Sequence, residues 1–346
     1  MQGKAAWRHA LLALAGLATL AVNVLIYRQL LVEGVARLPF AMLCSALTAI
    51  PPIGVMLALD HYEIEPLGHM VLVFYCGASI APGFTLLIGP KTFFAGALAE
   101  EGAKALLVLG VCHFFAHEVD EPVDALIYSF LVAIGFGFTE NNIHFTNHPG
   151  FHGDLAVLVS LLAVRFAAMI GHLTFTGLFG TGLAIRLETG SKVSIPLSFA
   201  AGVGLHYLWN STPLAGGPAF LLRFLPFVLL VFFVARRFHR HESALIREYG
   251  SYYPIIQEFV EGQQEEFPDR ARRFEVLGDV MVRPWSLECR ARYQHFQAVS
   301  KLAFLRWNMR RGLGPAGEAA QQREQVLVAR IQSTYLKLKD CRKDET

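Results

Sequence analysis

The sequence is poor in charged residues, and this shortage argues against an ordinary soluble enzyme. Only 17% of the 346 residues are charged and 54% are hydrophobic, whereas a soluble domain of average composition carries about 25% charged residues. The charges are also unevenly placed, because 26 of the first 240 residues are charged, against 32 of the last 106. The chain therefore divides into an apolar block, residues 1–240, and a polar tail, residues 241–346.

Several familiar functional signals are also missing. The five cysteines include no CxxC or CxxxC pair, which argues against a cysteine-based zinc site. The net charge of +2 is too small to indicate binding to nucleic acid. The apolar block contains no GxSxG or HExxH motif and no pair of aspartates, so serine, thermolysin-like and aspartyl mechanisms lack support.

The apolar block does contain a series of long apolar runs, each close to the roughly 20 residues that a helix needs to cross a bilayer. They predict an all-α, polytopic membrane protein with about eight transmembrane helices, at residues 7–27, 39–59, 67–88, 92–116, 123–146, 157–185, 195–212 and 218–236. The lipid bilayer is thus an expected partner of the chain.

Eight spans place both termini on the same side of the membrane. Seven basic residues fall in the loops on that side and four in the loops on the other, which favours cytoplasmic termini because cytoplasmic loops are enriched in Lys and Arg. The seven are Lys4, Arg8, Arg186, Lys192, Arg236, Arg237 and Arg240.

The polar tail reads as a C-terminal cytosolic helical domain. Helices are expected at about 241–262, 285–311 and 316–341. In the last of these, apolar residues recur at helical spacing, at Val326, Val328, Ile331, Tyr335 and Leu338. Nothing in the tail indicates a partner.

Polar side chains cluster in four of the predicted spans, where an ionisable residue is costly and therefore a candidate for function. They are Glu100, Glu101 and Lys104; Glu140, Asn141 and Asn142; Arg165 and His172; and His206 and Asn210. At 1.5 Å per residue, Glu100 lies roughly 12 Å from the start of its span, and Glu140 and His206 lie roughly 9 Å from the ends of theirs. Because successive spans alternate in direction, these residues lie at one level, which predicts a single shared site.

The residue types in this site suit the hydrolysis of peptides. Hydrolysis needs a base to activate water and donors to stabilise an oxyanion. Glu100 and Lys104 are i,i+4 neighbours, and Glu101 points about 100° away from them. We therefore expect that one glutamate activates water and that the other pairs with Lys104.

Supporting and metal-binding roles follow from the other side chains. Arg165 suits pairing with a carboxylate, and Asn141 and Asn210 suit orienting or oxyanion roles. His172, His206 and Glu140 have the ligand types of a catalytic zinc site. The alternative is a glutamate–histidine pair that activates water without a metal.

Four segments in order resemble the motifs of the PrsW family of intramembrane peptidases, distant relatives of the CAAX prenyl proteases. Residues 100–104, Glu-Glu-Gly-Ala-Lys, look like its EExxK motif, and residues 136–141 match FxxxEN. Arg165 followed by residues 172–180 resembles the third motif, and residues 206–210 resemble HxxWN. The resemblance covers residues 100–210.

The resemblance implies an intramembrane peptidase that cleaves membrane-embedded or membrane-proximal protein substrates, such as anti-sigma-factor-like proteins, in a bacterial or archaeal plasma membrane. It carries the catalytic role onto five residues, Glu100, Glu101, Glu140, His172 and His206. Both glutamate-dependent and metal-dependent mechanisms are described for such enzymes, and zinc is therefore one expected cofactor.

Two other classes of function fit the same composition. A proton- or metal-coupled transporter also needs Glu, His and Asn at membrane depth, but it predicts polar residues along a path through both leaflets. A non-catalytic receptor or scaffold predicts that Glu100 and Glu140 tolerate replacement by Gln. Proteolysis assays on Glu→Gln and His→Ala variants separate these classes.

Overall fold

The computed structural model describes residues 65–115, 119, 121–147, 155–211, 286–312 and 317–343, with short stretches between 225 and 283. Within these residues every regular element is an α-helix, as the sequence predicts. The spans predicted at 7–27 and 39–59 lie outside the described residues. The helices predicted at 218–236 and 241–262 are described only at scattered positions.

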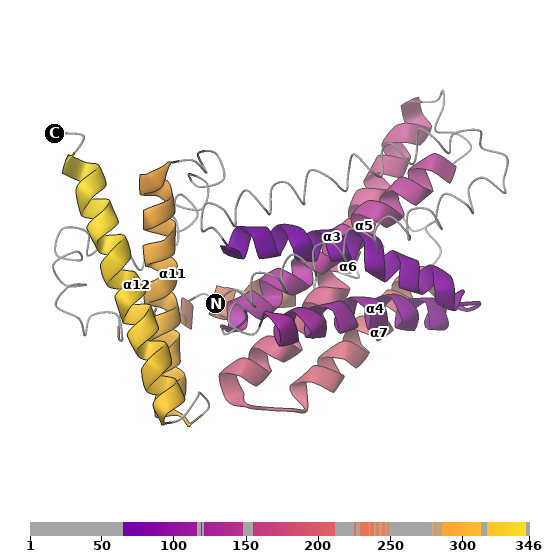
Figure 1. Cartoon of the computed structure of the whole chain (residues 1–346). Coiled ribbons are helices and arrows are strands. Elements are labelled where there is room, and N and C mark those ends of the chain that lie inside the picture. Colours follow the sequence, from indigo (N-terminus) through magenta and orange to yellow (C-terminus); the bar gives the residue numbers. More distant parts are fainter. Residues whose placement is uncertain are drawn as a thin grey trace. The chain divides into compact units, whose positions relative to one another are not determined.

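The helices that are described follow the predicted runs closely (Figure 1). In the apolar block they are α3 (Glu65–Ile88), α4 (Phe93–Phe114), α5 (Pro122–Asn147), α6 (Leu155–Thr189) and α7 (Ser194–Ser211). In the tail they are α11 (Leu287–Arg310) and α12 (Glu318–Lys343).

Three of the described helices contain a stretch long and apolar enough to cross a membrane, namely His69–Ile88, Pro122–Asn141 and Ala167–Thr189. Helix α4 is not among them, because it carries three charged residues, Glu100, Glu101 and Lys104, within two turns. The total of eight spans and the cytosolic position of the tail stay predictions.

Local chemistry sets the ends of these helices. The Thr92 hydroxyl caps α4 by accepting a hydrogen bond from the Ala95 N–H, at 3.1 Å, and so satisfies one of the free donors at the helix start. Gly89, which follows α3, has φ +56°, a left-handed conformation that glycine adopts without a steric cost. The turn between α3 and α4 is therefore encoded by residues 89–92.

Glycines bring the helices of the apolar block into backbone contact. A Cβ atom on Gly77 of α3 would lie 2.5 Å from the Val132 carbonyl oxygen of α5, and one on Gly180 of α6 would lie 2.5 Å from the Ser129 hydroxyl of α5. Helices in lipid associate through close packing at small residues, because the hydrophobic effect does not drive helices together there. This packing positions α5, α6 and α7 around the site.

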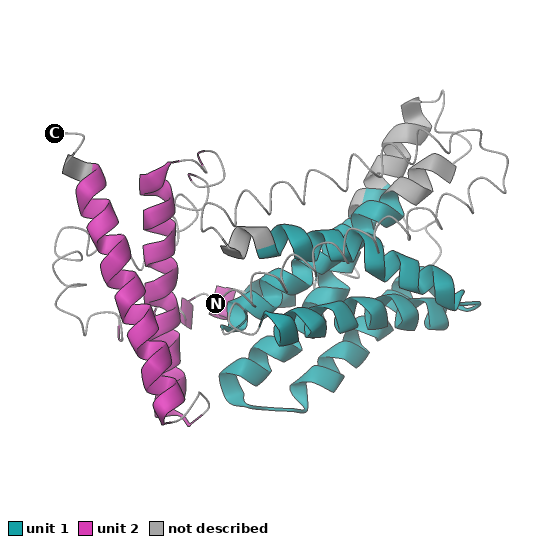
Figure 2. Ribbon diagram, in the orientation of Figure 1, with its two compact units in different colours: residues 1–58, 66–234 teal, residues 59–65, 235–346 magenta. Residues whose placement is uncertain are grey.

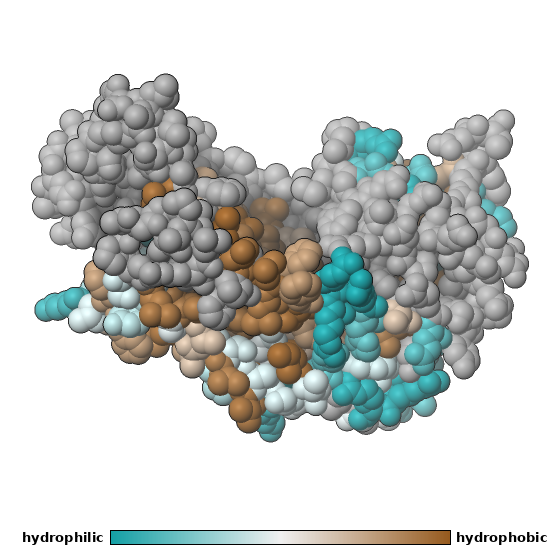
Figure 3. Space-filling view, turned by 180° about the vertical axis from the view of Figure 1, so that it is seen from behind, coloured by the Kyte–Doolittle hydropathy of each residue, from teal (hydrophilic) through white to brown (hydrophobic). Residues whose placement is uncertain are grey.

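The chain divides into two compact units, residues 1–58 with 66–234, and residues 59–65 with 235–346 (Figure 2). The first unit exposes large apolar side chains, among them Leu87, Phe93, Leu106, Val193 and Leu197. Apolar surface gathers on the helices of this unit and hydrophilic surface on the helices of the second (Figure 3). Exposed apolar area of this extent is expected of a surface that faces lipid.

The second unit contains the α11–α12 hairpin, whose core is apolar. Its buried cluster includes Val299, Leu302, Leu305, Leu327 and Ile331. Of the apolar residues noted at helical spacing on α12, Ile331 and Leu338 are buried, whereas Val326 is 67% exposed. The buried positions of this helix are Ala320, Leu327, Ile331, Thr334 and Leu338. Those positions recur every three, four or seven residues, the spacing of one helix face.

Replacing Gly202 of α7 by Ala should destabilise the protein, and replacing Gly204 should not. A Cβ on Gly202 would lie 2.5 Å from the Phe175 carbonyl oxygen, whereas nothing lies within 4 Å of one on Gly204. We expect a loss of about 1–3 kcal/mol for Gly202→Ala and a gain of about 0.5–1 kcal/mol for Gly204→Ala. Thermal melting in detergent measures both, and equal melting temperatures would contradict the close approach of α6 and α7.

The hairpin should lose stability as the pH falls from about 6.5 to about 4. Burial lowers the pKa of His295 from 6.5 to about 4, so the folded hairpin holds a neutral imidazole, which contacts the Thr334 hydroxyl at 2.9 Å. Stability is complete above the unfolded pKa and falls by about 3 kcal/mol on acidification to the folded pKa. Urea midpoints followed through Trp307 fluorescence at pH 7 and pH 5 test this. His295→Gln should remove the difference between the two pH values.

Candidate active site

Four helices of the first unit supply the site. Helix α4 contributes Glu100, Glu101 and Lys104, α5 contributes Glu140, α6 contributes His172, and α7 contributes His206. Helix α4 packs against α5, α6 and α7, so that polar side chains from all four meet. The side chains that the sequence places at one membrane level thus come together in the structure.

A buried ion pair joins Glu101 and Lys104. The Lys104 Nζ atom lies 2.5 Å from the Glu101 Oε1 atom, and the two side chains are 3% exposed or less. Lys104 therefore pairs at i,i+3 with Glu101, and not at i,i+4 with Glu100. Its Nζ atom also lies 4.3 Å above the Phe136 ring, in the geometry of a cation–π contact.

Glu101 receives two further hydrogen bonds. The Thr176 hydroxyl donates to Oε2 at 2.9 Å, and the His206 Nδ1 atom lies 2.8 Å from Oε1. Both carboxylate oxygens are thus occupied by partners from α4, α6 and α7. A buried charge is tolerated when it is paired and fully hydrogen-bonded. The Glu101 carboxylate is therefore held in one orientation at the centre of these contacts.

Glu140 belongs to a second group of contacts. Its Oε2 atom lies 3.1 Å from the Arg165 Nη2 atom and 2.5 Å from the His172 Nε2 atom. Arg165 also donates from Nε to the Asn141 Oδ1 atom at 2.6 Å. Arg165 thus pairs with a carboxylate, as its chemistry predicts, and its charge balances that of Glu140.

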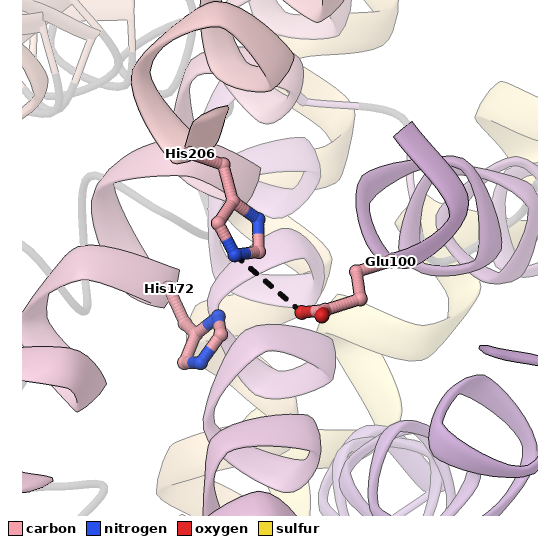
Figure 4. Close-up of side chains that lie close together, drawn as sticks. All are labelled: Glu100, His172 and His206. Carbon is pink, nitrogen blue, oxygen red and sulfur yellow. Dashed lines mark ion pairs between the residues drawn. The ribbon is translucent and has the colours of Figure 1, made fainter. Parts of the chain in front are cut away.

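Glu100, His172 and His206 converge on one point (Figure 4). Each offers a ligand atom, and these atoms lie within 4.8 Å of one another. The buried Glu100 Oε2 atom has no hydrogen-bond partner among the described residues, and it lies 3.5 Å from the His206 Nε2 atom. The sequence led us to expect Glu140 as the carboxylate ligand beside the two histidines, whereas Glu100 is the carboxylate grouped with them in the structure.

The donor set fits a metal ion such as zinc. Carboxylate and imidazole are zinc ligands, and the buried Glu100 Oε2 atom has no hydrogen-bond partner among the described residues. The contact between His206 Nδ1 and Glu101 is the outer-shell arrangement that orients a metal-binding histidine. The residues present therefore match a site built around Glu100 and His206, with His172 beside them.

Aromatic rings fix the orientation of both histidines. Phe175 stacks on His206 with ring centroids 4.8 Å apart and an angle of 17° between the planes. Phe136 meets His172 edge to face at 5.2 Å, and the planes of the two imidazoles are inclined at 85°. The two imidazoles therefore present their nitrogens in different directions.

Sequence reasoning did not single out Thr176, Phe175 or Phe136 as parts of the site. Thr176 lies in residues 172–180, the segment that resembles the third motif, one helical turn after His172. Asn210 is half-buried one turn after His206, and the hydrogen bonds described above for this cluster do not involve its side chain. The side chain of Asn142 lies outside the described residues.

Comparisons with known proteins match part of the chain to one family. Residues 70–236 match the model of a family described as PrsW family intramembrane metalloprotease. The protein named Protease PrsW from Geobacillus kaustophilus (strain HTA426) is 31% identical over 100 residues, which cover 25% of this chain and 43% of that protein. The match thus spans less than half of the curated relative's length. No solved structure matches.

Proposed function

We propose that this chain, whose residues 70–236 match the PrsW family of intramembrane metalloproteases, is a peptidase that hydrolyses peptide bonds in or next to the bilayer. The observation that carries the proposal is the convergence of Glu100, His172 and His206 inside a helical membrane unit. The peptidase lies in residues 1–240, and residues 241–346 form a separate helical tail.

The charges in the site single out Glu100 as the reactive carboxylate. Lys104 balances Glu101, and Arg165 balances Glu140, whereas the described side chain that faces Glu100 is His206, whose imidazole can be neutral. An uncompensated carboxylate in a medium of low dielectric constant attracts a proton or a metal cation. Glu100 is therefore the group best placed to take a proton from water or to hold a cation.

Each of the other residues has a part in this proposal. Glu100 accepts the proton of the attacking water and later delivers it to the leaving amine, as a general base and then a general acid. His206 faces Glu100 through Nε2 and is held through Nδ1 by Glu101. Glu101 and Lys104 act by positioning. Glu140 and Arg165 hold His172 from the other side.

Zinc is the metal that these ligands suit. Glu100 and His206 would hold it, and His172, whose ring nitrogens contact Lys104 and Glu140, lies beside them. When bound, the ion would supply Lewis-acid polarisation of the scissile carbonyl group. Everything else in the site, including the proton acceptor and the orientation of both imidazoles, comes from the chain itself.

The substrate class follows from where the site lies. The polar cluster is enclosed by helices whose outer faces are apolar, so a substrate reaches it from the bilayer or from the adjacent surface. We propose membrane-spanning or membrane-proximal protein segments as substrates, with anti-sigma-factor-like proteins as one such class. The chain would span a bacterial or archaeal plasma membrane several times, with both termini in the cytoplasm.

Glu100→Gln and Glu101→Gln should have different effects. Glu100→Gln should lower cleavage about 10²–10⁴-fold, the contribution of a general base, without lowering the melting temperature, because it removes an unbalanced charge. Glu101→Gln should destabilise the protein by about 3–5 kcal/mol, because Lys104 is left buried and unpaired. Cleavage of a single-span reporter protein in detergent and thermal melting measure the two effects. Near-normal cleavage by Glu100→Gln would refute the proposed role.

Purified protein should contain close to one equivalent of zinc, and this zinc should be lost in His206→Ala. Chelation should abolish cleavage, and added zinc should restore it, because the ion polarises the substrate carbonyl. His113→Ala is the matched control, since His113 is an exposed histidine near the end of α4 and should leave the zinc content unchanged. Full activity of metal-stripped protein would remove zinc from the mechanism and leave the glutamate in place.

The topology can be tested with single cysteines in a background where the other cysteines are replaced by Ala. A membrane-impermeant maleimide should label Cys341 of α12 only after cells are permeabilised, because the basic residues before the tail favour the cytoplasm. Lys91→Cys, in the exposed turn between α3 and α4, should be labelled on intact cells. The opposite pattern would invert the topology.

A further inference from the structure

The two histidines of the site contact groups of opposite hydrogen-bonding character. We propose that Glu101 and Lys104 hold His206 and His172 in opposite neutral tautomers, and that Thr176 is a positioning residue that fixes Glu101. The tautomers rest on the observed contacts alone, and the chemical roles that follow from them rest on the proposed function.

His206 is the tautomer with a proton on Nδ1. That nitrogen lies 2.8 Å from the Glu101 Oε1 atom, and the carboxylate, ionised beside Lys104, can only accept a hydrogen bond. Nδ1 is therefore the donor, and in the neutral ring Nε2 carries the lone pair. Nε2 is the atom that faces Glu100 at 3.5 Å.

His172 is the tautomer with a proton on Nε2. Its Nδ1 atom lies 3.2 Å from the Lys104 Nζ atom, and a lysine ammonium group donates hydrogen bonds but accepts none. Nδ1 therefore carries the lone pair. The proton on Nε2 is donated to the Glu140 Oε2 atom at 2.5 Å.

Thr176 completes the arrangement from α6. Its hydroxyl donates to the Glu101 Oε2 atom at 2.9 Å and so fixes the rotation of the carboxylate whose other oxygen receives Lys104 and His206. Without that donor, Glu101 has one oxygen unsatisfied in a buried position and is free to turn. The orientation of His206 would then depend more on its ring contacts with Phe175 and His172.

The two imidazoles consequently have different roles. His206 offers a lone pair next to Glu100 and is the imidazole that holds a metal or accepts a proton. His172 has both ring nitrogens engaged, Nδ1 by Lys104 and Nε2 by Glu140, and so presents no lone pair to a metal. Loss of His206 should therefore weaken zinc binding much more than loss of His172.

Nitrogen NMR of the full-length, chelator-treated protein with ¹⁵N-labelled histidine tests the tautomers directly, because protonated and unprotonated ring nitrogens have well-separated shifts. His172→Gln and His206→Gln identify the two signals by their disappearance. We expect Nδ1 protonated in His206 and Nε2 protonated in His172. The same tautomer in both rings, or the reverse assignment, would overturn the proposal, whatever the cleavage assay shows.

The role of Thr176 is tested with Thr176→Val, which keeps the shape of the side chain and removes the donor. It should mix the tautomers of His206 and weaken zinc binding about 10–100-fold, the usual effect of an outer-shell partner, and Thr176→Ser should restore both. Thr174→Val is the matched control, because the buried Thr174 hydroxyl donates to the Ile170 carbonyl of its own helix. Equal effects of the two valine variants, or no rescue by serine, would reduce Thr176 to a packing residue.

If no zinc binds to any variant, the His206 spectrum of Thr176→Val still decides the positioning role. A protein with the expected tautomers but no peptidase activity would refute the proposed function and leave the arrangement of the histidines intact. A protein that cleaves peptides but has other histidine tautomers would support the proposed function and refute the proposed arrangement of the histidines.

Discussion

The buried ion pair between Glu101 and Lys104 is the interaction on which the rest of the site depends. Removing two such charges from water costs several kcal/mol per ion, and their attraction offsets this cost only when further hydrogen bonds satisfy both groups. Here Thr176 and His206 supply bonds to the carboxylate. The pair is therefore stable only when α4, α6 and α7 are packed together, and the glycine contacts between the helices allow that packing.

Much of the helical architecture could be predicted from the sequence, because lipid imposes a simple rule on it. The apolar runs had to be long enough to span and had to end at Pro, Gly or polar residues, and the helices observed between residues 65 and 211 begin and end within a few residues of the predicted runs. The meeting of Glu100, Glu140 and His206 followed from the alternating direction of successive spans. The depth of a residue in the membrane can thus be predicted from its position along its span and from the direction of that span.

The finer contacts could not be predicted, because they depend on how each helix is rotated about its axis. Spacing alone left Lys104 able to reach either glutamate, and only the positions of α6 and α7 make Glu101 its partner. The grouping of Glu100, rather than Glu140, with both histidines has the same origin. Thr176 and Phe175 look like ordinary residues of a span, and only the fold shows that they hold Glu101 and His206.

The length of α6 has a consequence for the membrane itself. Its 35 residues make a rod about 52 Å long, against a hydrocarbon core of about 30 Å. A helix so much longer than the core must tilt, project into the headgroups or thicken the surrounding lipid. His172 lies near the middle of this rod, so the depth of the reactive groups follows its tilt. Under the proposed function, lipids of different acyl chain length would shift the bond presented for cleavage along the substrate, and bilayer thickness would help to determine the cleavage position.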